Sequence, residues 1–218
     1  MTRDNIAICG YPRSGSTLLY NMLRASVVGY RTFDREISAA GLRERGPWIS
    51  KDPTDRRHPD LPVERIITVR DARDVLCSVH ASHPDRYKVS WDRTIAGKRG
   101  QQIVRTEGLL EIDRQCQAID GVVVYYETLC RDPLAVQRTL GDALGLEFDR
   151  PFTRWTEAET PPGLEKQLNG KRQVSTDRIG AWQSFPERIL RQFTECPALH
   201  DVLERHGYEG GRSWLDTL

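Results

Sequence analysis

Short apolar segments that alternate with helical stripes constrain the fold of this chain more than any other feature. Four segments have the composition of short buried strands: 6–9 (IAIC), 48–51 (WISK), 65–69 (RIITV) and 122–126 (VVVYY). Apolar residues recur at helical spacing in three others: 17–25, 72–80 and 134–144. Strands that alternate with helices predict an α/β fold, in which a parallel sheet is flanked by helices. Ligands of such sheets bind at the carboxyl ends of the strands.

The length, charge and cysteine content narrow the class of protein. The 218 residues fit one domain, so we expect residues 1–218 to form a single domain. The 32 basic and 31 acidic residues leave a net charge of +1, which favours neither nucleic acid nor a membrane surface as a partner. The longest apolar run is far shorter than the ~18 residues of a membrane span. With five scattered cysteines and no secretory segment at the start, we expect a cytoplasmic protein with reduced thiols and no metal site.

Two regions are less regular. A largely polar stretch from 88 to 118 is predicted to be helical, with interruptions at Gly97, Gly100 and Gly108. After Pro151 the pattern weakens into a long loop, and a helical carboxyl end follows. A long loop in a compact domain is more often functional than idle.

The first candidate site is segment 10–17 (GYPRSGST), between the first strand and the first helix. Such a turn directs backbone N–H groups and the positive helix end at one point, which suits a tetrahedral anion. The hydroxyls of Ser16 and Thr17 and the charge of Arg13 would add donors. The lysine of a nucleoside-triphosphatase loop, GxxxxGK[ST], is absent, so Mg²⁺-assisted triphosphate chemistry loses its main signature. A phosphatase site built on Cys9 also fails, because too few residues separate it from Arg13. The alternative is an ordinary strand-to-helix turn.

The second candidate is segment 69–78 (VRDARDVLCS). Arg70 stands at the strand end, and Ser78 follows two helical turns later, which is ~11 Å along a helix. An arginine and a serine hydroxyl make a phosphate clamp if Arg70 reaches back over that helix. The alternatives for Arg70 are helix capping and a pair with Asp74.

Four motifs, in this order, resemble those of sulfotransferases that use 3′-phosphoadenosine 5′-phosphosulfate (PAPS). Segment 11–17 (YPRSGST) resembles their 5′-phosphosulfate loop, and segment 69–78 resembles their 3′-phosphate motif, including the Arg-to-Ser spacing. Segment 126–133 (YETLCRDP) is similar to the YEDL…DP segment of the family, and segment 178–182 (RIGAW) resembles its RIGRW element. The resemblance spans roughly residues 5–185 and implies a P-loop-like, three-layer α/β/α architecture.

The resemblance implies a donor-binding role for each matching position. The residues that would hold the 5′-phosphosulfate are Arg13, Ser14, Gly15, Ser16 and Thr17. Those that would hold the 3′-phosphate are Arg70 and Ser78, with Lys171, Arg172 or Arg178 from a late loop around 160–182 that covers the nucleotide. Tyr126 lies where the family places a residue near the adenine, and its alternative role is that of a core aromatic. Residues 170–172 (GKR) only approximate the RKG sequence of the family.

Sulfuryl transfer resembles phosphoryl transfer, so positioning and fixed charges supply most of the catalysis, and no metal is required. Arg13 would supply positive charge. Lys51 resembles the lysine of the family's K-T-P element, which neutralises charge on the leaving phosphate or a sulfuryl oxygen. A solvated surface lysine is the alternative.

A hydroxyl acceptor also needs a general base. The family uses either a glutamate shortly after the first helix or a histidine near the second strand end. Segment 51–53 (KDP) has no histidine, so Glu36 is the first candidate and Asp34 the second. His80 and His83 are more remote candidates. The alternative role for Glu36 is a surface pair with an arginine such as Arg35 or Arg43.

The function implied is transfer of a sulfuryl group from PAPS to a small-molecule, glycan or lipid hydroxyl, or to an amine. Two alternatives remain: a P-loop kinase of a small metabolite and a non-catalytic nucleotide-binding protein. The motifs describe the donor half of the reaction, and they leave the acceptor and the oligomeric state open.

Overall fold

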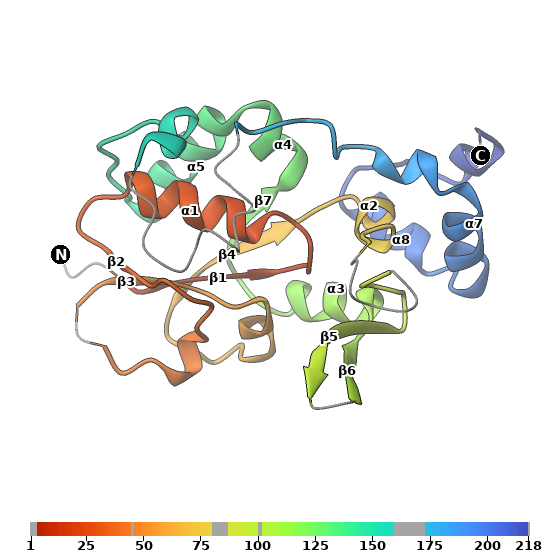
Figure 1. Ribbon diagram of the computed structural model, residues 1–218, viewed down its shortest axis with the longest axis horizontal. Coiled ribbons are helices and arrows are strands. Elements are labelled where there is room, and N and C mark those ends of the chain that lie inside the picture. Colours follow the sequence, from red (N-terminus) through yellow and green to blue (C-terminus); the bar gives the residue numbers. More distant parts are fainter. Residues whose placement is uncertain (1–3, 45, 80–86, 100–101, 159–172, 218) are drawn as a thin grey trace. The chain divides into compact units, whose positions relative to one another are not determined.

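The structure, a computed structural model, describes residues 4–44, 46–79, 87–99, 102–158 and 173–217 (Figure 1). The chain divides into two compact units. The first unit comprises Met1–Gly10, Ser14–Val69 and Ala118–Thr176, and the second comprises Tyr11–Arg13, Arg70–Gln117 and Asp177–Leu218. The expectation of a single domain stays a prediction.

The first unit is built on a five-stranded sheet. Its strands are β1 (Ile6–Gly10), β2 (Arg31–Thr32), β3 (Trp48–Lys51), β4 (Glu64–Val69) and β7 (Val122–Tyr125). The strand order is β2-β3-β1-β4-β7, and every pairing is parallel. The predicted α/β fold with a parallel sheet is therefore confirmed. All five residues of β1 are buried, as expected of a central strand that is covered on both faces.

Helices pack on one face of this sheet (Figure 1). They are α1 (Ser16–Ser26), α4 (Tyr126–Arg131), α5 (Pro133–Leu144) and the 3-10 helix η3 (Phe152–Glu157). Ile8 of β1 forms a buried cluster with Leu19 of α1, Leu140 of α5 and Phe152. Gly145 ends α5 in the left-handed conformation, as its position in the sequence predicts.

The opposite face carries a smaller cluster of Ala7, Ala39 and Trp48. Two 3-10 helices lie in this part of the chain, η1 (Ala39–Gly41) and η2 (Pro53–Arg57). The buried Asp55 of η2 joins them, because its carboxylate accepts hydrogen bonds from the Ser38 hydroxyl and the Ala39 N–H. Burial raises the pKa of this carboxyl, although both hydrogen bonds act in the opposite direction.

The second unit contains short helices and an antiparallel hairpin. Its elements are α2 (Ala72–Leu76), β5 (Arg93–Arg99), β6 (Gln102–Glu107), α3 (Leu109–Gln117), η4 (Ala181–Ser184), α7 (Pro186–Glu195), α8 (Leu199–Arg205) and η5 (Ser213–Thr217). Trp182, Phe193 and Trp214 form edge-to-face ring contacts in its core. The guanidinium of Arg73 lies over two of these rings, 4.1 Å from Trp182 and 4.8 Å from Trp214.

Two helical predictions in this unit are wrong. The helix expected over 72–80 ends at Leu76, because the following residues form an isolated bridge between Val79 and Tyr87 and a hydrogen bond from Lys88 N–H to Ser78 O. Within the described part of 88–118, only α3 is helical. Strands β5 and β6 pair as an antiparallel hairpin in which Arg93 faces Glu107. Its strands contain β-branched residues, which favour a strand over a helix.

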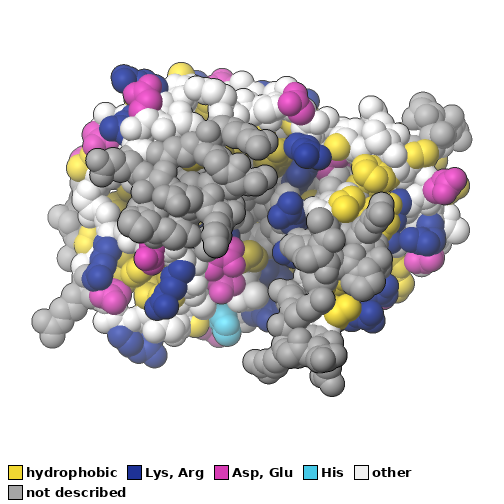
Figure 2. Space-filling view, in the orientation of Figure 1, with side chains coloured by type: hydrophobic (Ala, Val, Ile, Leu, Met, Phe, Trp, Pro, Cys, Tyr) yellow, Lys and Arg dark blue, Asp and Glu magenta, His cyan; other side chains and the backbone are white. Residues whose placement is uncertain are grey.

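The distribution of charged side chains on the surface agrees with the net charge of +1. Lys or Arg and Asp or Glu side chains are interspersed on the face shown in Figure 2. Among the helices that the structure describes, none has both the length and the apolar character needed to cross a membrane. The cytoplasmic location stays a prediction.

Gly10, the last residue of β1, is required by a close backbone approach. Its φ is +126°, and it pairs with Thr68 of β4. A Cβ at this position would collide with the backbone carbonyl and nitrogen of Thr68. Glycine is therefore needed both for the backbone conformation and for the space.

We predict that Gly10→Ala lowers the free energy of unfolding by about 2–5 kcal/mol, from backbone strain and overpacking together. Gly145→Ala is the matched control, because Gly145 has a φ of +63° with nothing within 4 Å of the added Cβ. It should cost only about 1–2 kcal/mol. Urea unfolding of both variants measures the difference. Equal losses would show that the close approach to Thr68 is not what requires glycine.

Candidate functional site

The loop between β1 and α1 is shaped by a second glycine. Gly15 is the N-cap of α1 and has a φ of +81°. A Cβ there would lie 2.5 Å from Cδ2 of Tyr126, so the Tyr126 ring packs directly on this turn. Ser14 is buried, and its hydroxyl bonds to that of Thr68 at 2.6 Å. Gly15 and Ser14 thus shape the turn. Of the two hydroxyl residues that follow, Ser16 is buried and Thr17 is half-buried.

The first turn of α1 offers donors to an anion. The N-cap provides no side-chain hydrogen bond, and the first turn contains no acidic residue. The first intrahelical bond runs from Leu19 N–H to Gly15 O at 3.0 Å. The N–H groups of the preceding helical residues therefore have no acceptor within the helix, and the helix dipole adds positive potential at this end.

Lys51, the last residue of β3, lies beside this turn. Its side chain is only 4% exposed, and Nζ donates to Oγ1 of Thr17 at 2.9 Å. It also forms an ion pair with Glu36. The solvated surface position considered for this lysine is therefore wrong. Thr17 and Lys51, which lie far apart in the sequence, meet at the carboxyl edge of the sheet.

The two candidate bases differ in their surroundings. The Glu36 side chain is 56% exposed and pairs with Lys51, rather than with the arginines considered from the sequence. Arg43 instead donates to the backbone carbonyls of Ala40 and Leu42. Asp34 is exposed. Of these two carboxylates, Glu36 is the one that the structure pairs with Lys51.

The neighbouring thiol is not a nucleophile. Cys9 is buried in β1, and burial raises the pKa of its thiol to about 12. A thiol in this state holds its proton at neutral pH. This agrees with the rejection of a phosphatase site at Cys9 and Arg13.

In the second unit, hydrogen bonds connect four predicted donor-binding residues. Nε of Arg13 donates to Oγ of Ser78 at 2.7 Å. Arg70 donates from Nη1 to the carbonyl of Arg13 at 3.3 Å and from Nη2 to the carbonyl of Arg178. The sequence assigned Arg13 to the 5′-phosphosulfate, but its side chain lies against Ser78, a predicted 3′-phosphate residue.

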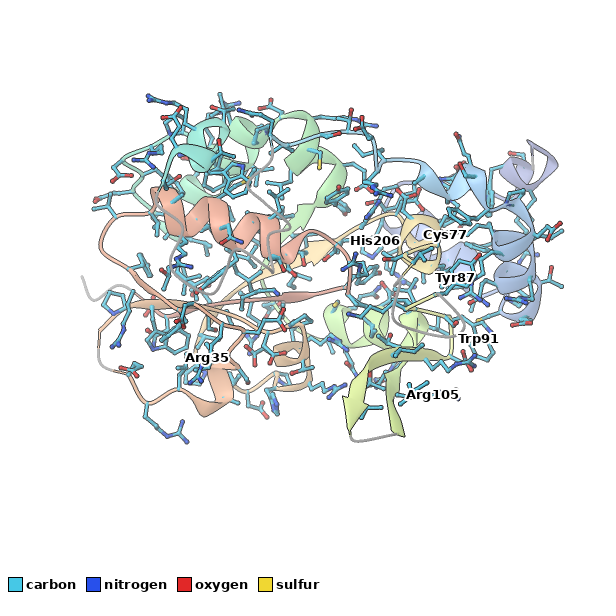
Figure 3. The ribbon with its side chains drawn as sticks, in the orientation of Figure 1. Arg35, Cys77, Tyr87, Trp91, Arg105 and His206 are labelled. Carbon is cyan, nitrogen blue, oxygen red and sulfur yellow. The ribbon has the colours of Figure 1, made fainter. Side chains whose placement is uncertain are left out.

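The early end of α2 makes this arrangement possible. Cys77 is the C-cap of the helix, and Ser78 lies beyond it (Figure 3). The chain between Arg70 and Ser78 therefore does not run as two full helical turns. Arg13 connects the two residues, because its carbonyl accepts from Arg70 and its side chain donates to Ser78. Arg70 therefore does not need to reach back over a helix.

Asp74 belongs to this site, although the sequence analysis considered it only as an alternative ion-pair partner of Arg70. Its Oδ2 accepts from Arg70 Nη2 at 3.2 Å and from Gly180 N–H at 2.9 Å, and its Oδ1 accepts from Trp182 N–H at 2.9 Å. Burial raises the pKa of Asp74, although Arg70 and the two N–H groups act in the opposite direction. The i,i+4 spacing of Arg70 and Asp74 was the available signal for the pair.

A second buried carboxylate holds the start of the loop. Asp113 of α3 accepts from the Tyr11 hydroxyl at 2.5 Å and lies 3.0 Å from Nε2 of His206. Burial raises the pKa of Asp113, but the hydrogen bonds from His206 and Tyr11 and the charge of Arg205 outweigh it, so the net shift is downward. Tyr11 is thereby fixed two residues before Arg13.

Four of the predicted positions lie outside the described residues: Lys171, Arg172, His80 and His83. Among the residues that are described, no group of three or more His, Cys, Asp or Glu side chains could hold a metal ion. The expectation of a reaction without a metal stays a prediction.

Comparison with known proteins supports one conclusion about the fold. No family model matches the sequence, and no curated protein matches it. A solved structure, the sulfotransferase domain from the Synechococcus PCC 7002 olefin synthase, is similar with a TM-score of 0.52 at 16% identity. The match covers 89% of this chain and 96% of that one. The chain therefore has a sulfotransferase-like fold.

Proposed function

We propose that this protein is a sulfotransferase that moves a sulfuryl group from PAPS to a hydroxyl or amine acceptor. The main support is the contact set of Arg13, Arg70 and Ser78 in the second unit. Two guanidinium groups and a hydroxyl suit a phosphate. PAPS carries a 3′-phosphate that ATP lacks, so these residues bear directly on the choice of donor.

The residues of the first unit suit the 5′ end of the donor. The first-turn N–H groups of α1 and the hydroxyls of Ser16 and Thr17 would bind its anionic oxygens. Lys51 would place a positive charge beside them, because its Nζ already bonds to Thr17. Tyr126 packs on Gly15, and its role near the adenine is part of the proposal.

In the second unit, the 3′-phosphate would bind Arg70 and Ser78. The contact between Arg13 and Ser78 favours assigning the Arg13 side chain to this phosphate. The side chain of Arg178 is exposed and would approach the same phosphate. For Lys171 and Arg172, which lie outside the described residues, the assignment rests on the resemblance alone. The other assignments rest on charge and contact together.

The reaction would be an in-line displacement. The acceptor oxygen forms a bond to sulfur as the bond from sulfur to the phosphate oxygen breaks. Lys51 would stabilise the charge that develops on the leaving phosphate or on a sulfuryl oxygen. The acceptor proton would pass to Glu36, whose side chain is 56% exposed while it pairs with Lys51.

The alternatives differ in measurable ways. A metabolite kinase would need the missing loop lysine and has no use for an Arg70–Ser78 phosphate site. A non-catalytic protein would bind the nucleotide without turnover. Comparing the affinities for 3′-phosphoadenosine 5′-phosphate and ATP separates sulfotransferase from kinase. A mass-spectrometric screen for the gain of a sulfuryl group, with PAPS and small-molecule, glycan and lipid acceptors, tests turnover.

We predict that Arg70→Ala weakens binding of 3′-phosphoadenosine 5′-phosphate at least about tenfold more than binding of adenosine 5′-phosphosulfate. The reason is that a charge-assisted hydrogen bond contributes ~1.5–3 kcal/mol. Titration calorimetry with both ligands gives the ratio. Arg114→Ala is the control, because Arg114 is an exposed arginine of the same unit that pairs with Glu111. Equal loss for both ligands would contradict the assignment of Arg70.

We predict that turnover is unaffected by excess EDTA, since arginine, lysine and backbone donors supply the positive charge that Mg²⁺ supplies in kinases. The measurement is the rate of sulfated product with and without chelator. Loss of sulfated product that Mg²⁺ restores would contradict a reaction without a metal.

We predict that Glu36→Gln lowers kcat by roughly 10²-fold or more, the scale of a lost general base. The glutamine retains an acceptor for Lys51, so affinity for 3′-phosphoadenosine 5′-phosphate should be preserved. Steady-state rates of sulfated product and calorimetry with 3′-phosphoadenosine 5′-phosphate measure the two effects.

Asp34→Asn is the matched control, because Asp34 is a neighbouring exposed carboxylate. It should keep near-normal turnover. A normal rate in Glu36→Gln with a slow Asp34→Asn would pass the role of base to Asp34.

A further inference from the structure

We propose that Asp74 is a positioning residue that orients Arg70 toward the 3′-phosphate by joining it to the late segment Arg178–Trp182. The inference rests on the proposed role of Arg70. Asp74 itself would touch neither the donor nor the acceptor.

Both oxygens of Asp74 are engaged by donors from two parts of the second unit. The side chain is 0% exposed. Oδ1 accepts the Trp182 N–H, while Oδ2 accepts the Gly180 N–H and Nη2 of Arg70. One carboxylate therefore fixes the backbone of the late segment and the guanidinium at the same time.

Arg70 is held on its other sides by backbone oxygens. Its side chain is 11% exposed, and it donates to the carbonyls of Arg13 and Arg178. Its contact with Arg178 depends on where the late segment lies, and Asp74 fixes that segment. Asp74 therefore acts on Arg70 twice, through the direct ion pair and through the position of the Arg178 carbonyl.

The late segment is anchored beyond this contact. The Trp182 ring is buried against Trp214, and the Arg73 guanidinium lies over both rings. Gly180 has a φ of +74°, and its N–H and that of Trp182 reach the same carboxylate. Asp74 thus connects Arg70 to a well-packed part of the unit.

Asparagine at position 74 would have a specific defect. It keeps the size of the side chain but replaces one acceptor oxygen by an NH₂ donor. Because each oxygen of Asp74 faces an N–H group, the amide would place a donor against a donor wherever it points. It would also remove the charge that orients Arg70.

The test measures how strongly the protein prefers a ligand with a 3′-phosphate. The ratio of the dissociation constants of adenosine 5′-monophosphate and 3′-phosphoadenosine 5′-phosphate is determined by calorimetry. We expect Asp74→Asn to lower this ratio at least fivefold. Asp55→Asn is the matched control, because Asp55 is a buried carboxylate of the first unit, outside the proposed donor site, that accepts from the Ser38 hydroxyl and the Ala39 N–H. It should leave the ratio within twofold of the wild type.

A second variant shows whether Asp74 acts through Arg70. Added to Arg70→Ala, the Asp74→Asn change should lower the ratio no further. An unchanged ratio in Asp74→Asn, a similar fall in Asp55→Asn, or a further fall in the double variant would each overturn the proposal. If Asp74→Asn does not fold, Asp74→Glu replaces it, and its longer side chain should lower the ratio at least threefold. A wild type with no preference for the 3′-phosphate would contradict the proposed function, and the role of Asp74 with it.

Discussion

The parallel pairing of β1 with β4 is the constraint on which the rest of the site depends. Gly10 lies so close to the Thr68 backbone that no side chain fits at that position. Both strands end at the same edge of the sheet, and each leads directly into a site segment. One continues through Tyr11 to Arg13, and the other continues into Arg70. Arg13 and Arg70 lie far apart in the sequence, yet the segments that contain them follow two adjacent strands.

Two buried charges then give the site its electrostatic character. Burying a charge is costly unless it is paired and hydrogen-bonded. Lys51 is compensated by the Thr17 hydroxyl and Glu36, and Asp74 is compensated by two backbone N–H groups and Arg70. Because each charge has several fixed partners, its direction is determined before any ligand binds. Such preorganised charge is what transfer of an anionic group requires.

The elements that sequence reasoning assigned wrongly lie in the second unit. The stretch 88–118 contains enough polar residues to resemble an exposed helix, but its β-branched residues pair across a hairpin instead. The helix after Arg70 stops early because Ser78 and Val79 bond to Lys88 and Tyr87. Both errors have one cause. Pairing with a distant segment outweighed a local periodicity that was weak to begin with.

The sequence by itself determined the parallel α/β sheet and the glycine that ends α5, and it supplied the candidate donor-binding residues. It could do so because apolar periodicity and turn chemistry are local, and because the motifs keep their spacing along the chain. Tertiary structure decided that Arg13 contacts Ser78, that Lys51 is buried against Thr17 and Glu36, and that Asp74 binds the backbone of the late segment. Each of these contacts joins residues from different elements, so only the folded chain fixes the distance between them and the burial that sets their charge interactions.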